Sequence, residues 1–428
     1  TIFDQSISSL NRQQSNFLEV SQQIASGRRV VNPSDDPQAA SRAVRVDQSK
    51  AVSQQFADSR VSARNSLAQT ESVLNSVSDA VTRGKTLMVQ ASNGTLSDAD
   101  RQSVASELRG VYESVIGQAN ATDGNGTHLF GGYKDSSEPF IRKTDAEGNE
   151  FIDYVGDSNA REQRIDSSRL MKVAENGESI FRSAPSGAGY IAEAEPEPDP
   201  FDSTAAISDL GTVTFSGPRI VDSDKAASGN GFVIELPNGD LSKSNVDVRK
   251  LKANGDESTS TVPSSDPDLD IVDTDEGISV TYEGVSVDLE GEGGTNDKIN
   301  VAPAQNDKMN TDLFRTFEKA LNVLENPADT DAKEAALDNT LKTVMREFDN
   351  SLDNVLTERA SVGARLNELD VVDSVGSDRM INYESTLSDL VDLDYAEAVS
   401  DFTLRQTGLQ ASQRTFAEIK DLSLFNFL

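Results

Sequence analysis

The 428-residue chain contains no cysteine and no tryptophan, and its one histidine is His128. Without cysteine, neither a disulfide framework nor thiolate chemistry is available, so packing alone must stabilise the fold. A single histidine excludes metal motifs that need two, and a closed zinc site has too few ligands. His128 lies in a glycine-rich loop, and we interpret it as a structural or surface residue. No metal site is expected.

Long apolar runs and positive charge are also scarce. No segment of about 18 apolar residues suggests a membrane span, so no membrane insertion is expected. The balance of 72 acidic against 39 basic residues, a net charge of -33, argues against nucleic acid and anionic membranes as partners. No cleaved signal segment is recognisable. A cytoplasmic protein and a protein exported without a cleaved signal would share these features, so both localisations remain open.

Motifs of catalysis and of cofactor binding are missing. The sequence has no G-x-S-x-G elbow and no phosphate-binding loop, and Gly291, Gly293 and Gly294 fail the dinucleotide spacing. The acidic run 266–276 begins with the alternate spacing of a calcium loop, but the loop's glycine position is Ile271 and its final acidic position is Gly277. We therefore predict no catalytic residue, no cofactor and no enzyme. A calcium-dependent adhesin is a minor alternative.

Proline divides the chain into three parts. Ten of the thirteen prolines lie between Pro139 and Pro303, and none lies in 38–138 or 328–428. Because an internal proline costs a helix about 3 kcal/mol, long helices are expected at the two ends only. The middle should have a different structure.

The N-terminal part reads as three helices. The first carries an amphipathic stripe at spacings of three and four and can end at Gly27. Asp36-Pro37, a cap followed by proline, then starts a second helix that should run to about 93–94. Ser97 and Asp100 resemble a capping box before a third helix, which breaks at 120–126. The stripe of the first helix is Phe3, Ile7, Leu10, Phe17 and Ile24, and the seven-residue seam of the second is Leu67, Leu74, Val81 and Met88.

The C-terminal part mirrors this pattern. A short helix near 309–325 is stopped by Asn326-Pro327, and a second long helix follows it. Apolar residues then recur about seven apart to the end of the chain, which predicts a terminal helix with the period of the first. This C-terminal stripe is Val391, Tyr395, Ala398, Phe402, Leu409, Phe416 and Ile419.

The middle of the chain is acidic and reads as strands. Residues 138–306 hold 34 acidic and 14 basic side chains, whereas 1–50 hold five and six. Short apolar runs such as 232–236 and 278–282 predict β-strands. The fold class is therefore α+β, a long antiparallel helical rod or coiled coil from both chain ends with an inserted β-rich domain. The expected parts are 1–36, 37–140, 141–305, 306–385 and 386–428. Heptad periodicity requires that the terminal stripes be buried, but it leaves open whether the partner is the same chain or a neighbouring subunit.

Four segments resemble the flagellin superfamily, and their details favour its hook-associated protein 3 family over flagellin. They cover about the first 140 and the last 120 residues, while 141–295 is individual. The segments are S-G-R-R-V with P-S-D-D-P in 26–37, L-M-V-Q-A-S-N-G-T-L at 87–96, L-F-G-G-Y in 129–140, and R-A-S-V-G-A-R-L at 359–366 with the terminal 422–428.

The resemblance implies a structural subunit of the bacterial flagellum, on the extracellular side and secreted without a cleaved signal peptide. Such subunits join the hook, through hook-associated protein 1, to the flagellin filament and so serve motility. They form a ring of identical subunits after unfolded passage through the type III export apparatus with an export chaperone. The two terminal stripes would be the assembly elements, an inner coiled-coil layer. Filament flagellin is the alternative. Pro33, Ser34, Asp35, Asp36 and Pro37 would be an intersubunit contact, although an ordinary interhelical turn explains them equally well.

Overall fold

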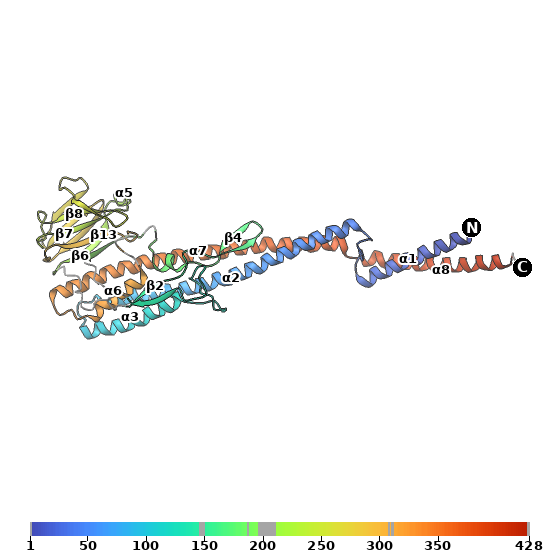
Figure 1. Cartoon of the computed structure of the whole chain (residues 1–428), viewed down its shortest axis with the longest axis horizontal. Helices are drawn as coiled ribbons and strands as arrows, with labels where there is room; N and C mark the ends of the chain where they lie inside the picture. The colour runs from blue at the N-terminus through green and yellow to red at the C-terminus, as the bar shows by residue number, and fades with distance from the viewer. Residues whose placement is uncertain are drawn as a thin grey trace. The chain divides into compact units, whose positions relative to one another are not determined.

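A computed structural model describes residues 2–144, 150–185, 188–195, 211–306, 309 and 312–425 (Figure 1). By its internal contacts the chain divides into two compact units. Unit 1 comprises Thr1–Val61, Arg164–Arg169 and Leu369–Leu428, and unit 2 comprises Ser62–Gln163 and Leu170–Glu368. No helix among the described residues is long and apolar enough to cross a membrane.

The two ends of the chain are helical, as predicted. Among the described residues the long helices are α1 (Ile2–Ser26), α2 (Pro37–Ala91), α3 (Asp98–Ala119), α6 (Leu313–Glu325), α7 (Asp331–Val391) and α8 (Tyr395–Phe425). The predicted seam of α2 is confirmed, because Leu67, Leu74, Val81 and Met88 are all fully buried. The capping box at the start of α3 is also present, with both of its hydrogen bonds.

Helices α2 and α7 run antiparallel, and ion pairs join them in each unit. Within unit 1, Lys50 pairs with Glu384 at 2.9 Å. Within unit 2, Arg359 pairs with Glu71 at 2.8 Å. The antiparallel helical arrangement that the sequence predicts is therefore the one observed.

Two helix boundaries differ from their predicted positions, and each has a local cause. Helix α2 ends at Ala91 rather than near 93–94, because the Asn93 side chain accepts hydrogen bonds from the Thr95 amide at 3.2 Å and hydroxyl at 2.9 Å and so folds a turn. Helix α6 begins at Leu313 rather than near 309, because Asp312 caps it and accepts a hydrogen bond from the Phe314 amide at 2.8 Å.

The inserted segment is β-rich, as predicted, with two short helices, α4 (Gly177–Phe181) and α5 (Ser223–Ala226). Its strands before residue 230 are β1 (Phe140–Thr144), β2 (Glu150–Tyr154), β3 (Glu162–Asp166), β4 (Arg169–Lys172), β5 (Tyr190–Glu195) and β6 (Thr214–Ile220). The later strands are β7 (Gly231–Leu236), β8 (Asp247–Leu251), β9 (Glu257–Thr261), β10 (Leu269–Asp273), β11 (Gly277–Tyr282), β12 (Val285–Glu290) and β13 (Asp297–Pro303).

The larger strands form two antiparallel sheets that share one core. Their orders are β10-β11-β12-β6 and β5-β13-β7-β8-β9, and β1-β2 and β3-β4 pair as hairpins. Side chains from both sheets, among them Phe232, Val280 and Val301, belong to a single buried cluster. The strands predicted at 232–236 and 278–282 are therefore confirmed, and both contribute to this core.

Within unit 2, the insertion is held on α7 by a stripe of buried polar side chains, which we call the α7 polar stripe. Its members are Asn339, Thr343, Asn350 and Asn354, and all are less than 9% exposed. Asn339 donates to the Val213 carbonyl at 2.8 Å, and its side-chain oxygen accepts from the Phe215 amide at 3.0 Å.

The other members of the α7 polar stripe also bond to main-chain groups of the insertion. Thr343 donates to the Ala192 carbonyl at 2.8 Å, and Asn354 donates to the carbonyls of Ser179 and Ile180 at 2.8 and 2.9 Å. Because buried polar groups are costly unless they are paired, this stripe fixes where the insertion docks on α7.

Candidate assembly surface

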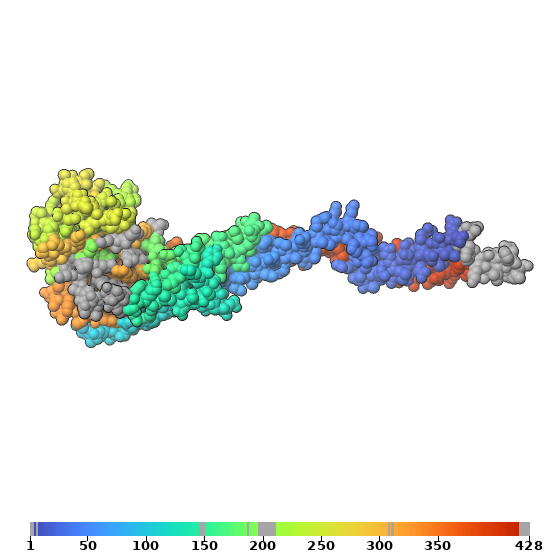
Figure 2. All heavy atoms as spheres, viewed as in Figure 1, coloured from blue at the N-terminus to red at the C-terminus, as the bar shows by residue number. Residues whose placement is uncertain are grey.

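In unit 1, α1 and α8 lie side by side and pack against each other (Figure 2). The Phe17 and Phe402 rings meet at a centroid distance of 5.0 Å. The Ser412 hydroxyl donates to the Gln13 side-chain oxygen at 2.5 Å, and Val20 and Ala398 are buried. Leu10, Gln13, Phe17, Val20 and Ile24 recur at spacings of three and four, so α1 presents a heptad seam to α8. We call this contact the inner seam.

The structure brings most of the two predicted stripes together at the inner seam, but it buries them only in part. Val391 and Ala398 are buried, whereas Tyr395 is 55% exposed. Ile7 is 36% exposed. The residues of the two predicted stripes that have intermediate exposure are Leu10, Phe17, Ile24, Phe402, Leu409 and Phe416. The side chains of Phe3 and Ile419 and residues 426–428 lie outside the described part of the chain.

Backbone hydrogen bonds join the break between α1 and α2 to the break between α7 and α8. The Leu393 amide donates to the Gly27 carbonyl at 3.1 Å, and the Arg29 amide donates to the Val391 carbonyl at 2.7 Å. Gly27 ends α1 with a φ of +70°, and a Cβ there would lie 2.9 Å from the Tyr395 hydroxyl. The positive φ therefore favours glycine at this position. This explains the helix end predicted at Gly27.

The loop 33–37 contains both structural and exposed residues. Asp35 accepts hydrogen bonds from the amides of Asn32 and Val31 at 2.6 and 3.2 Å and closes the turn. Asp36 accepts from the Ala39 amide at 3.0 Å, as the predicted cap of α2. That backbone hydrogen bond, together with the neighbouring Arg29 guanidinium, lowers the pKa of Asp36. Pro33, Ser34 and Pro37 are exposed. Asp35 is exposed as well, and Asp36 is of intermediate exposure.

Replacement of Asp36 by alanine should weaken the start of α2 by about 1 kcal/mol, because the Ala39 amide loses its acceptor. Amide hydrogen exchange at Ala39 should then accelerate about fivefold. Asp47→Ala, which removes an exposed carboxylate farther along the same helix, is the control and should leave that exchange unchanged. An unaltered exchange rate in Asp36→Ala would contradict the capping role.

A buried arginine in unit 1, which the sequence reasoning missed, ties the β3–β4 turn to the long helices. The side chain of Arg60 is 5% exposed, pairs with Asp373 of α7 and donates to the Ile165 carbonyl at 3.1 Å. Gly376 makes room for it, since a Cβ there would lie 2.5 Å from an Arg60 nitrogen. Nearby, Arg379 pairs with Asp166 at 3.1 Å. The one feature of the sequence that could have pointed to this packing is Gly376, a glycine within a predicted long helix.

Exposed apolar side chains concentrate in unit 1. Of eighteen large hydrophobic side chains that are exposed among the described residues, eleven belong to unit 1, which is less than a third of the chain. They are Ile7, Leu18, Val44, Val52, Val61, Val371, Val375, Ile381, Tyr395, Val399 and Leu404. Single exposed apolar side chains are normal on a protein surface, so it is their concentration in unit 1 that is notable.

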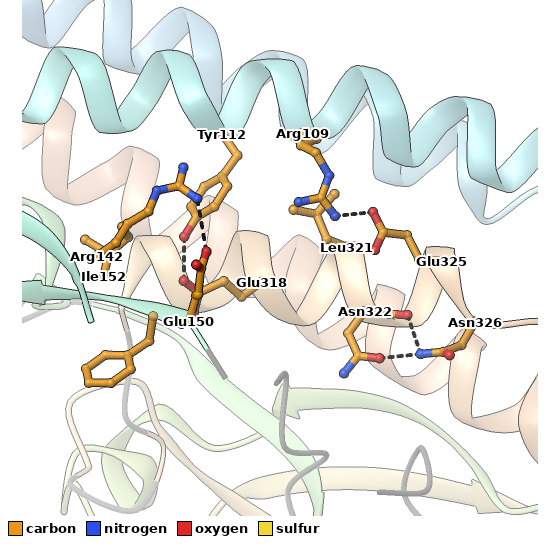
Figure 3. Close-up of a pocket in the computed structure, with 11 residues that line it drawn as sticks. Arg109, Tyr112, Arg142, Glu150, Ile152, Glu318, Leu321, Asn322, Glu325 and Asn326 are labelled. Atoms are coloured by element: carbon orange, nitrogen blue, oxygen red, sulfur yellow. Dashed lines mark hydrogen bonds and ion pairs between the residues drawn. The ribbon is translucent and has the colours of Figure 1, made fainter. Parts of the chain in front are cut away.

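Unit 2 contains a cleft of about 330 Å³ between α3, α6 and the β1–β2 hairpin (Figure 3). Tyr112 reaches from α3 and donates to the Glu318 carboxyl of α6 at 2.5 Å. Burial, with a smaller contribution from Asp312, raises the pKa of Glu318 to about 8, against the opposing effects of the Tyr112 hydrogen bond and Arg315. At neutral pH the Glu318 carboxyl is therefore mostly protonated. Arg109 and Glu325 pair at the rim.

The acidic run 266–276 is spread over a turn and a strand. Asp268 pairs with Lys225 at 2.6 Å, and Asp273 accepts a hydrogen bond from the Lys243 amide at 2.8 Å. In the part of the chain that the structure describes, no group of three histidine, cysteine or acidic side chains is placed to hold a metal ion. His128 lies in the loop after α3, with its Nδ1 2.9 Å from the Asn120 carbonyl.

Comparisons with known proteins agree with the arrangement of the two ends. Residues 4–135 match the family model "Bacterial flagellin N-terminal helical region". The chain is 30% identical to flagellar hook-associated protein 3 of Escherichia coli over 429 residues, which cover 99% of this chain and 96% of that protein. A phase 1 flagellin of Salmonella naestved is 32% identical, but over only 28% of this chain and 24% of the flagellin.

Solved structures show a similar fold. The crystal structure of flagellar hook-associated protein 3 from Legionella pneumophila matches with a TM-score of 0.64 at 24% identity, over 81% of this chain and 98% of that one. The crystal structure of FlgL from Xanthomonas campestris matches with a TM-score of 0.59, also at 24% identity, over 80% of this chain and 99% of that one.

Proposed function

We propose, from the premise that this chain belongs to the flagellar hook-associated protein 3 family, that its helices α1 and α8 are the elements through which copies assemble. The chain is a structural, non-enzymatic protein of the flagellar hook–filament junction, and it acts in the extracellular flagellum.

The observation that carries the proposal is the incomplete burial of unit 1. The inner seam covers one side of α1 and of α8, yet Phe17 and Phe402 remain partly exposed. Leu18 and Leu404 lie elsewhere on the same helices and are 52% and 71% exposed. Because apolar side chains in water favour association, this surface is suited to neighbours in a ring of identical subunits.

The partners in the flagellum follow from the position of such a ring. It would contact hook-associated protein 1 on the hook side and flagellin on the filament side, and the exposed loop residues Pro33, Ser34 and Pro37 are available for contacts between subunits.

Export through the type III apparatus with a chaperone requires an unfolded chain, and the absence of cysteine means that no disulfide opposes unfolding. Filament flagellin is the weaker alternative, since the flagellin match covers only about a quarter of the chain.

A strain that lacks this gene should have hooks but release flagellin into the medium, and the wild-type gene should restore attached filaments. The Phe402→Asp variant places a charge in the inner seam, so it should restore at least tenfold fewer attached filaments than wild type. Val272→Asp, which changes an exposed apolar side chain of the insertion, is the control and should restore them fully. Filaments that stay attached in the deletion strain would refute the junction role.

A further inference from the structure

The chain contains six Asn-Gly pairs, and all of them lie among the residues that the structure describes. In such a pair the main-chain nitrogen of the glycine can attack the side-chain carbonyl of the asparagine, because glycine has no Cβ to crowd the approach. The attacking nitrogen must be free of other hydrogen bonds and within reach of hydroxide. The fold therefore decides which pairs react. The pairs are 93–94, 125–126, 176–177, 230–231, 238–239 and 254–255.

Five of the six pairs are protected at the attacking nitrogen. Four of the glycine amides donate to main-chain carbonyls at 2.8 to 3.3 Å, and Gly231 is buried in β7, where it pairs with Leu251. Asn176 is also held at its side chain, which accepts from the Ser179 amide and donates to the Ser158 carbonyl, both at 2.7 Å. The four bonded amides are those of Gly126, Gly177, Gly239 and Gly255.

The remaining pair, Asn93-Gly94, lies in the exposed turn that follows α2 in unit 2. The Gly94 amide makes no hydrogen bond with any residue that the structure describes. Space is open where a Cβ on Gly94 would lie, and the residue does not have a positive φ. Neither packing nor backbone conformation therefore requires glycine at this position, and the attacking nitrogen is exposed to water.

The side-chain carbonyl of Asn93 is polarised by a neighbouring residue. Its Oδ1 accepts two hydrogen bonds from Thr95, one from the hydroxyl at 2.9 Å and one from the amide at 3.2 Å. Donors in this position stabilise the negative charge that develops on a carbonyl oxygen under attack, as in an oxyanion hole. The Nδ2 of Asn93, which must leave, bonds to no described residue. In Asn254, by contrast, that nitrogen donates to the Asp256 carboxylate at 2.7 Å.

We propose that Asn93 undergoes spontaneous deamidation, with Gly94 as the nucleophile and Thr95 as the activating residue. Hydroxide removes the proton of the Gly94 amide, and the nitrogen lone pair forms a bond to Cγ of Asn93. The tetrahedral intermediate then expels the side-chain nitrogen, which takes a proton from water and departs as ammonia. A cyclic succinimide remains between residues 93 and 94.

Water then opens the succinimide at one of its two carbonyls. Cleavage of the bond between Cγ and the Gly94 nitrogen leaves an aspartate, whereas cleavage of the bond between the main-chain carbonyl carbon and that nitrogen leaves an isoaspartate. Either product places a new negative charge in the turn between α2 and α3, and the isoaspartate adds one methylene to the main chain there. The reaction needs no partner, so it is independent of the assembly role proposed for α1 and α8.

Timed incubation of the purified chain, followed by digestion and mass spectrometry, would measure the reaction. At pH 8, aspartate and isoaspartate should form at residue 93 about tenfold faster than at any other Asn-Gly pair, because a hydrogen-bonded amide must open before it reacts. The reaction should be slower at pH 6, where hydroxide is scarcer. In urea, which unfolds the chain, the six pairs should react at similar rates. Another pair that reacts first in the folded chain, or equal rates in the folded and unfolded chain, would overturn the assignment.

Three variants at exposed positions test the roles of the neighbouring residues. Gly94→Ala, which the open space accommodates, should slow the reaction at Asn93 about tenfold, because a Cβ crowds the attack. Thr95→Val removes the hydroxyl donor and should slow the reaction about threefold, whereas Thr95→Ser keeps the donor and should match the parent. An unchanged rate in Gly94→Ala would contradict attack by this nitrogen, and equal rates in the two Thr95 variants would overturn the activating role of the hydroxyl.

Discussion

Replacement of Lys319 by alanine is expected to lower the free energy of unfolding by about 3–5 kcal/mol. The Lys319 side chain is 2% exposed, and its nitrogen lies 2.5 Å from a Glu193 oxygen of β5 and 3.0 Å from a Glu347 oxygen of α7. Thr316 donates to the second Glu347 oxygen at 3.0 Å. Without the lysine, two buried carboxylates would lose the cation that they share, and buried unpaired charge is costly.

Urea unfolding followed by circular dichroism would measure this loss. The matched control is Lys333→Ala, which breaks the more exposed pair of Lys333 with Asp329 at 2.5 Å, one helical turn apart where α7 begins. That change should cost less than about 0.5 kcal/mol, because exposed ion pairs contribute little. A loss below about 1 kcal/mol in Lys319→Ala would mean that the network between the insertion and the helices is not a main source of stability.

Stability should also fall as pH rises from about 5 to 8, because of Glu318. Its pKa is raised from 4.5 to about 8 in the folded state, mainly by burial. Between these two values the folded state holds a proton that the unfolded state has released, so the stabilisation is complete below pH 4.5 and is lost as pH approaches 8. The total loss is on the order of 4 kcal/mol, at up to about 1.4 kcal/mol per pH unit.

The Glu318→Gln variant should remove this slope, since a neutral amide keeps a partner for Tyr112 and has no proton to lose. Glu325→Gln at the rim of the same cleft should retain the parent slope, because Glu325 is 43% exposed and does not occupy the buried position. Urea unfolding at pH 5, 6, 7 and 8 would measure the free energy of unfolding of the parent protein and of the two variants. Parallel curves for the parent and Glu318→Gln would show that Glu318 does not carry the pH dependence.

The helical ends were predictable because their local signals agree with one another. Gly27 ends α1 with a positive φ and a hydrogen bond from its amide to the Gln23 carbonyl at 2.8 Å. The Asp36 side chain caps α2, and Ser97 with Asp100 caps α3, each by bonding to amides of the same short segment. The apolar period of α2 then specifies its buried side. Signals of this kind need no knowledge of the rest of the fold, so sequence periodicity and capping rules are sufficient.

The interactions that position the insertion were not predictable, because they join polar residues far apart in the chain. Asn339 and Thr343 resemble solvent-facing helix residues in the sequence, and their partners lie more than 100 residues away. Arg60 likewise looks like an exposed charge until the β3–β4 turn covers it. Periodicity predicted that the terminal stripes would be buried, but a heptad pattern does not specify how much of that burial a single chain supplies.

The α7 polar stripe bonds to main-chain carbonyls and an amide, which are present in every polypeptide whatever its side chains. Strands of different sequence but similar path could therefore occupy the same place on the helix. Side chains of the insertion can therefore change while these backbone contacts to α7 are kept. Domain grafting onto this scaffold should succeed where the donor keeps backbone groups at the positions that Asn339 and Thr343 contact and a carboxylate at the position of Glu193, which pairs with Lys319.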